Sequence, residues 1–227
     1  MEKEAGILIL KYEAKICLPT YKIIYSLCFI FLFSVVRGIS DVDEIGIALD
    51  AYMAILAIVF CADALQAEHS GKRWEIFGRC PGKIRRRTLL IRIAIQCLYL
   101  WILSALGYAC FFLQRPGNIG TVSGTTLFCL FLGAVLISIL FWGTLAFTFS
   151  NLCKNTWAGI GIAVTLWLFA NSTIGEKMLG NLNVFAFVFR DTHNPADMGW
   201  LWGKGLALAL ALLIALIQPQ PKINKHL

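Results

Sequence analysis

Residues 122–149 read VSGTTLFCLFLGAVLISILFWGTLAFTF, a run without a single charged side chain. A helix needs about 20 mostly apolar residues to cross the hydrocarbon core of a bilayer, and this run is long enough to cross at a tilt. Lipid offers no hydrogen-bond partner to the backbone, so a run of this kind folds as a helix. The stretch therefore predicts an all-α integral membrane protein.

Five further apolar runs reach or approach the same length, which gives six expected membrane spans. The spans are residues 19–36, 45–65, 89–113, 122–149, 157–174 and 201–217. The fifth is short, and the sixth carries Lys204 near its start. No linker, low-complexity run or fixed-period repeat divides the chain, so we expect residues 1–227 to form a single transmembrane domain.

The composition excludes several classes of protein. Hydrophobic residues make up 59% of the chain and charged residues 15%, and the mean hydropathy is +0.74. A soluble domain has about 45–50% apolar and about 25% charged residues. The chain is therefore not expected to be a soluble enzyme, a disordered regulator or a disulfide scaffold.

The positive charge reports the topology of the spans. The net charge is +7, which on a soluble chain would suggest a nucleic-acid partner. Of the 20 Lys and Arg residues, 15 fall on the side of the two termini and of the segment between spans two and three. Cytoplasmic loops carry such an excess. We therefore expect both termini in the cytoplasm and no nucleic-acid partner.

The N-terminal entry, residues 5–18, resembles a helix that lies on the membrane surface. Lys11, Glu13 and Lys15 interrupt an otherwise apolar stretch, and Pro19 then turns the chain into span one. The alternative is that this stretch is the cytosolic start of span one. No small-x-small cleavage pattern follows span one, so we expect this span to remain as an anchor.

The sequence offers no catalytic or metal-binding motif. None of the eight cysteines is paired at CxxC spacing, the three histidines are far apart, and there is no Walker A loop or GxSxG elbow. A membrane-embedded enzyme would need a nucleophile–base or metal constellation. We therefore expect a non-catalytic chain that binds no metal.

Ionisable residues within spans are candidates for function because burying a charge in lipid is costly. Asp50 is expected about two turns into span two from the outer side, and Lys204 near the outer surface. Asp63 lies near the inner end of span two, while Lys22 and Arg92 are expected to snorkel to the inner surface. With no charge expected at mid-membrane, a proton relay and an ion-coupled carrier are disfavoured.

Residues 66–88 form the largest cytosolic element. Trp74 and Phe77 would be a liability in a short basic loop if nothing covered them. They could dock into a partner protein as aromatic anchors. Alternatively, they could lie among lipid headgroups, with the basic run holding anionic lipid.

The order of residues in this segment resembles the ABC-2 type transporter permeases. An acid, a base, a second acid, an aromatic, a proline and a basic run follow one another: Glu68, Lys72, Glu75, Phe77, Pro81 and Arg85–Arg87. In that family a short coupling helix joins spans two and three. The family also has re-entrant helices between spans five and six. Residues 175–199, an apolar stretch interrupted by charges, fit that segment, with an amphipathic surface helix as the alternative.

The resemblance implies partners and site residues. Two permease copies, identical or paralogous, would sit above two ATPase subunits that bind ATP and Mg²⁺, with no cofactor on this chain. The expected ATPase contact is Glu68, His69, Lys72, Arg73, Trp74, Glu75 and Phe77. The candidate translocation path is Phe29, Phe33, Asp50, Trp157, Trp167 and Phe169.

The implied function is ATP-driven export across a bacterial plasma membrane by alternating access. Spans rich in Phe and Trp favour amphipathic or hydrophobic cargo, and toxic or antimicrobial peptides of the phenol-soluble modulin or lantibiotic kind fit best. Lipid, lipid-linked glycan or drug export is the first alternative. A non-transporting membrane protein that gives immunity by binding a peptide is the second.

Overall fold

The computed structural model is mainly helical and contains no strand in the residues that it describes, which are 2–35, 42–65, 77, 79–114, 124–190 and 198–217. Its helices are α1 (Glu2–Cys17), α2 (Thr20–Val35), α3 (Val42–Ala62), α5 (Gly82–Leu113), α6 (Gly124–Cys153), α7 (Thr156–Ala170), α8 (Thr173–Leu179), the 3-10 turn η2 (Gly180–Leu182) and α9 (Trp200–Ile217). The all-α prediction is confirmed for this part of the chain.

Four of these helices, α3, α5, α6 and α9, are long and apolar enough to cross a membrane. Two bent pairs, α1 with α2 and α7 with α8, raise the number to six if each pair is one span. At 1.5 Å per residue, the 16 residues of α2 and the 15 of α7 rise only about 22–24 Å, against a hydrocarbon core of about 30 Å. The architecture is that of a multi-pass membrane protein with four to six candidate spans.

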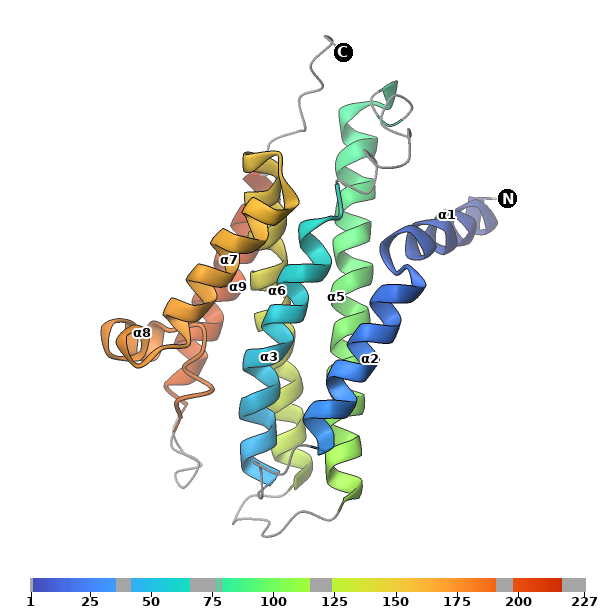
Figure 1. Ribbon diagram of the computed structural model, residues 1–227. Coiled ribbons are helices and arrows are strands. Elements are labelled where there is room, and N and C mark those ends of the chain that lie inside the picture. The colour runs from blue at the N-terminus through green and yellow to red at the C-terminus, as the bar shows by residue number, and fades with distance from the viewer. Residues whose placement is uncertain are drawn as a thin grey trace.

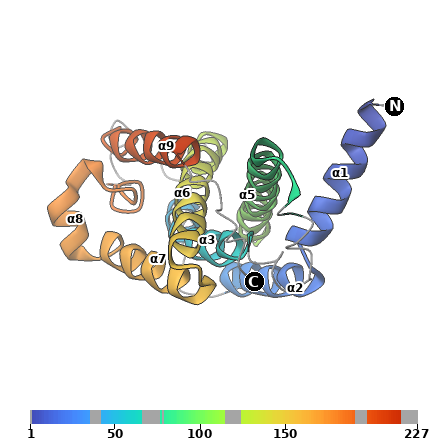
Figure 2. The same cartoon turned by 90° about the horizontal axis from the view of Figure 1, so that it is seen from above.

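Helices α3 and α6 form the centre of the bundle (Figure 2). On one side lie α2 and α5, and on the other lie α7 and α9. Small side chains allow α3 and α6 to approach closely, and at Gly143 of α6 an added Cβ would lie 2.9 Å from Cys61 Sγ. Since α3 is covered on nearly all sides, its Met53, Ala54 and Ala57 are fully buried.

An elbow at Leu18–Pro19 separates α1 from α2. The two helices meet at 64°, and α1 points away from the bundle (Figure 1). Proline disfavours helical geometry at the residue before it and tolerates the first turn of the helix that follows. The Pro19 carbonyl accepts from the Lys22 backbone N–H at 2.9 Å, which begins α2. The helix expected over residues 5–18 is present, and it begins earlier, at Glu2.

Helix α5 differs most from its expected span, because it begins at Gly82 rather than at residue 89. Its 32 residues rise about 48 Å, well beyond the thickness of the hydrocarbon core. Lys83 and Arg85–Arg87, which were expected in the 66–88 loop, therefore occupy the first two turns of a helix. Lys and Arg are good helix formers, and Pro81 stands at the N-cap, so the helix extends up to that proline.

The helix expected over residues 157–174 ends at Ala170, and α8 turns away from it by 72°. The Ser172 hydroxyl accepts from the Gly175 N–H at 3.1 Å and begins α8. After η2, Asn183 turns the chain back. Its side chain donates to the Ala170 carbonyl at 2.8 Å and accepts from the Phe185 N–H at 2.9 Å. Phe185 and Phe187 are thereby buried against the bundle.

The start of α5 and the end of α9 lie at the same end of the bundle as α1 (Figure 1). The ends of α3 and α6 lie there too. The end of α3, the start of α5 and the end of α9 therefore share one end of the bundle with α1.

The contact between α9 and the chain before it can be tested at two glycines. A Cβ at Gly203 would clash with the backbone carbonyls of Asn181 and Asn183, whereas a Cβ at Gly205 meets nothing within 4 Å. We expect Gly203→Ala to lower the free energy of unfolding by about 1–3 kcal/mol through overpacking. Gly205→Ala should be neutral or stabilising by up to about 1 kcal/mol, because alanine favours helix over glycine.

The measurement is thermal or denaturant unfolding of both purified variants in detergent. Equal stability of the two variants would show that residues 181–183 do not pack on α9.

Candidate functional site

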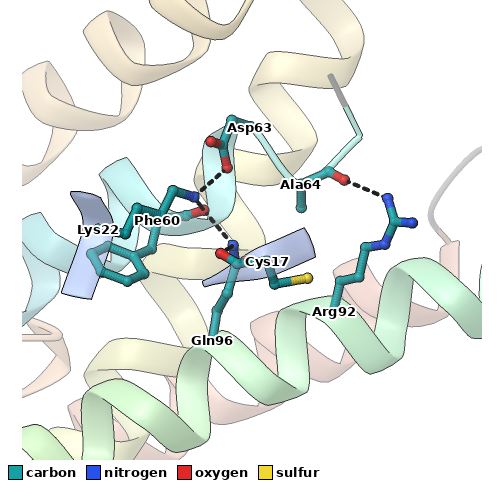
Figure 3. Close-up of polar contacts among 7 residues, drawn as sticks. All are labelled: Cys17, Lys22, Phe60, Asp63, Ala64, Arg92 and Gln96. Carbon is teal, nitrogen blue, oxygen red and sulfur yellow. Dashed lines mark hydrogen bonds and ion pairs between the residues drawn. The ribbon is translucent and has the colours of Figure 1, made fainter. Parts of the chain in front are cut away.

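The carbonyl end of α3 lies inside the bundle and is closed by side chains of two other helices. The last carbonyls of a helix have no partner within it, and an apolar bundle supplies no water to replace one. The Phe60 carbonyl accepts from Lys22 Nζ at 3.1 Å and from Gln96 Nε2 at 2.8 Å. Arg92 Nη1 donates to the Ala64 carbonyl at 3.2 Å. Figure 3 shows these side chains converging on the end of α3.

Both cations at this end are paired with carboxylates. Lys22 Nζ lies 2.7 Å from Asp63 Oδ1, and Arg92 Nε lies 2.6 Å from Glu13 Oε2. Lys22 is 3% exposed and Arg92 is 2% exposed. The prediction that these two side chains snorkel to the surface is therefore wrong. They turn into the protein, where carboxylates and helix-end carbonyls offset the cost of burying charge.

Gln96 joins the ends of two helices. It is fully buried, and its Nε2 also donates to the carbonyl of Cys17, the last residue of α1, at 3.3 Å. We call the whole set the α3-end network. It consists of Glu13, Cys17, Lys22, Phe60, Asp63, Ala64, Arg92 and Gln96. Through it, α1, α2, α3 and α5 meet at one place.

The α3-end network flanks the segment that resembles a coupling helix. Most of the expected ATPase contact lies outside the described residues, namely Glu68, His69, Lys72, Arg73, Trp74 and Glu75. The structure does describe Phe77, which is half-buried and packs against the core. The Arg92 guanidinium carbon lies 5.8 Å from the centre of the Phe77 ring, a cation–π contact. Phe77 therefore anchors the segment to the bundle.

A second polar cluster lies deep in the bundle. Lys204 Nζ of α9 is 2.6 Å from Asp50 Oδ2 of α3 and 2.5 Å from Ser138 Oγ of α6. All three side chains are buried. Ser138 stands halfway along α6 and Asp50 near the middle of α3. Asp50 was expected about two turns into its span and Lys204 near the outer surface, each on its own, whereas the structure pairs them.

Two polar atoms near this pair have no partner. Asp50 Oδ1 and the indole nitrogen of Trp142, one turn after Ser138, make no hydrogen bond within the part of the chain that the structure describes. The Phe187 ring lies 5.9 Å from Lys204 Nζ, and Phe185 stacks on Trp142 at 5.7 Å between centroids. Buried polar atoms normally have a protein or water partner. A water molecule would find hydrogen-bond partners here.

The candidate path residues do not gather in one place. Phe29 and Phe33 pack on each other along α2, and Phe33 also contacts Tyr52 of α3. On α7, Trp157 is 80% exposed and Phe169 42%. Trp167 is buried, and its indole donates to the Ala51 carbonyl at 3.0 Å. Of the six residues, Asp50 and Trp167 are buried, and Trp167 reaches α3 at the residue that follows Asp50.

The sequence analysis missed neutral polar residues inside apolar helices. Gln96 and Ser138 are the only uncharged side chains that complete the two clusters through their own polar atoms. A lone amide in an apolar helix is a signal that could have identified Gln96, because lipid cannot satisfy it. Ser138 carries no such signal, since a hydroxyl can bond to its own helix.

All eight cysteines are free, and no three His, Cys, Asp or Glu side chains of the described segments could hold a metal ion. Each carboxylate of the two clusters faces a cation rather than a nucleophile. The arrangement holds helices together through ion pairs and hydrogen bonds.

No protein-family model, curated protein or solved structure matches this chain. The residues and their geometry therefore carry the functional argument.

The Asp50–Lys204 pair can be tested by a double-mutant cycle. Asp50→Asn or Lys204→Met alone leaves one buried charge uncompensated, and we expect each to cost about 3–5 kcal/mol of unfolding free energy. The double variant should recover most of that loss, because neither charge remains.

Denaturant unfolding of the purified variants measures the cycle. Lys177→Met serves as the control, since Lys177 is exposed and a surface substitution usually changes stability by less than about 0.5 kcal/mol. Additive losses in the double variant would contradict the pairing.

Proposed function

We propose that this chain is the membrane subunit of an ATP-driven exporter of the ABC-2 type. The observation that supports this most is the α3-end network. Asp63 and Ala64 precede residues 66–76, and Phe77 and Arg92 follow them, so both flanks of that segment attach to the same buried cluster. Because both flanks of the segment are attached, a movement that a partner protein imposes on it would be transmitted to the bundle.

The α3-end network connects this segment to the helices of the bundle. Movement of the segment would reach α3 through Asp63 and Ala64, α5 through Arg92, and α1 through Glu13. Packed helices linked by ion pairs shift as rigid bodies between discrete arrangements. An ATPase that closes on ATP and Mg²⁺ would then rock these helices together, which is what alternating access requires.

The charge at this end supports a cytoplasmic orientation. Exposed cations gather there on α1, on the start of α5 and on the α6–α7 turn: Lys15, Arg79, Lys83, Arg87 and Lys154. Cytoplasmic ends of spans carry such an excess. We therefore propose a bacterial plasma-membrane protein with both termini inside.

The exposed faces of α2 and α7 are apolar. This supports an apolar cargo or a second permease copy as the partner that contacts them. Helix α7 has no charged residue, and the single charge of α2, Lys22, is buried. Exposed aromatic side chains such as Phe31 and Trp157 stand on these helices. We propose amphipathic peptides as cargo, with lipids, lipid-linked glycans and drugs as the alternative substrates of the same machine.

Co-purification from the native host tests the proposal. The tagged chain, solubilised in mild detergent, should carry an ATPase with a Walker A motif, identified by mass spectrometry. The complex should hydrolyse ATP, and a cargo peptide should raise the rate. Peptide binding without an associated ATPase would instead support the immunity protein. Turnover of a substrate without ATP would contradict both.

The coupling assignment predicts the effect of one aromatic truncation. Buried tryptophans at interfaces often contribute 2 kcal/mol or more, so Trp74→Ala should weaken ATPase association by about 30-fold or more. Trp202→Ala is the matched control, because Trp202 is 73% exposed at the opposite end of the bundle. Titration of each variant with the purified ATPase measures the difference, and equal affinity of both variants would refute the assignment.

A further inference from the structure

A shallow, open groove runs along the first three turns of α5. Its volume is about 450 Å³. Its lining residues follow one face of the helix at intervals of three and four: Lys83, Arg86, Arg87, Leu90, Ile91 and Ala94. This spacing brings all six side chains to one stripe.

The stripe is divided into a cationic part and an apolar part. The three cations occupy the outer end of the helix, and residues 79–114 contain no Asp or Glu to neutralise them. Lys83 and Arg87 are exposed. Arg86 is fixed by α9, since its Nη2 donates to the carbonyls of Ala215 at 3.0 Å and Leu216 at 2.9 Å. The groove therefore has one preset cation and two that can close on an anion.

The apolar part has the depth of one membrane leaflet. From Leu90 the stripe continues through Ala94 to Leu98, which is 54% exposed. Eight residues of helix rise about 12 Å, and half of the hydrocarbon core is about 15 Å. A ligand that fits this surface carries a negative charge at one end and an acyl chain at the other.

We propose that this groove binds one anionic phospholipid. Lys83 and Arg87 contact the headgroup phosphate beside Arg86, and an acyl chain lies on Leu90, Ile91 and Ala94. A zwitterionic headgroup brings its own cation against three others, so it binds less well. A soluble phosphate lacks the chain that the apolar half of the groove would cover. The site requires a membrane around α5 and is independent of ATP-driven export.

Native mass spectrometry of the purified chain in detergent tests the site. Phosphatidylglycerol and phosphatidylcholine are titrated separately, and the anionic lipid should bind at least tenfold more tightly. Lys83→Gln/Arg87→Gln should weaken phosphatidylglycerol binding by about 25-fold, since each cation near an anionic headgroup contributes about a factor of five. The control Lys15→Gln/Lys154→Asn removes the same charge from exposed positions at the same end and should change binding by less than twofold.

A second pair of variants tests the acyl-chain half without changing charge. Ala94→Trp fills the groove and should weaken phosphatidylglycerol binding at least fivefold. Ala109→Trp, at an exposed position farther along α5, should not. Unchanged thermal midpoints in detergent confirm that every variant is folded.

Three results would overturn the proposal. Equal binding of the two lipids would remove the charge selectivity. Equal losses in the two charge variants would indicate diffuse attraction rather than a site. Competition by glycerol 3-phosphate at the same concentration as the lipid would identify a soluble anion as the ligand.

Discussion

The carbonyl end of α3 is the constraint on which much of the bundle depends. A helix that ends inside apolar surroundings must find donors for its last carbonyls. Lys22 and Gln96 supply them at Phe60, and Arg92 does so at Ala64. Each buried cation then needs a carboxylate, so Asp63 and, from α1, Glu13 are drawn in. One unsatisfied helix end thereby fixes the places of α1, α2 and α5.

Helix α3 is also held at its middle. Asp50 joins it to Lys204 of α9, and Ser138 of α6 completes that contact. Ionic links thus connect the central helix to helices on both of its sides. Buried ion pairs specify one arrangement at a large cost if a single partner is lost. If α3 moved relative to its neighbouring helices, the ion pairs of these two polar clusters would have to break or exchange partners.

Hydropathy was enough to locate the helices, because lipid permits little other than helix across a hydrocarbon core. Helix α5 begins before the expected span, because basic residues that mark a membrane surface can also continue a helix. Snorkelling of Lys22 and Arg92 was wrong for another reason. Their partners Asp63 and Glu13 lie 41 and 79 residues away in sequence, and one sequence does not reveal which helix faces meet. Gly203 of α9 receives the backbone carbonyls of residues 181 and 183, another contact that one sequence does not reveal.

Site-specific photo-crosslinking in the native host tests the central claim most directly, namely that the segment held by the α3-end network meets an ATPase. Trp74 is replaced by p-benzoylphenylalanine, and a chain with the same replacement at Trp202 is the control. The account predicts an adduct from position 74 whose peptides include a Walker A motif, and none from position 202. Adducts from position 74 that contain only lipid or this chain itself would contradict the account.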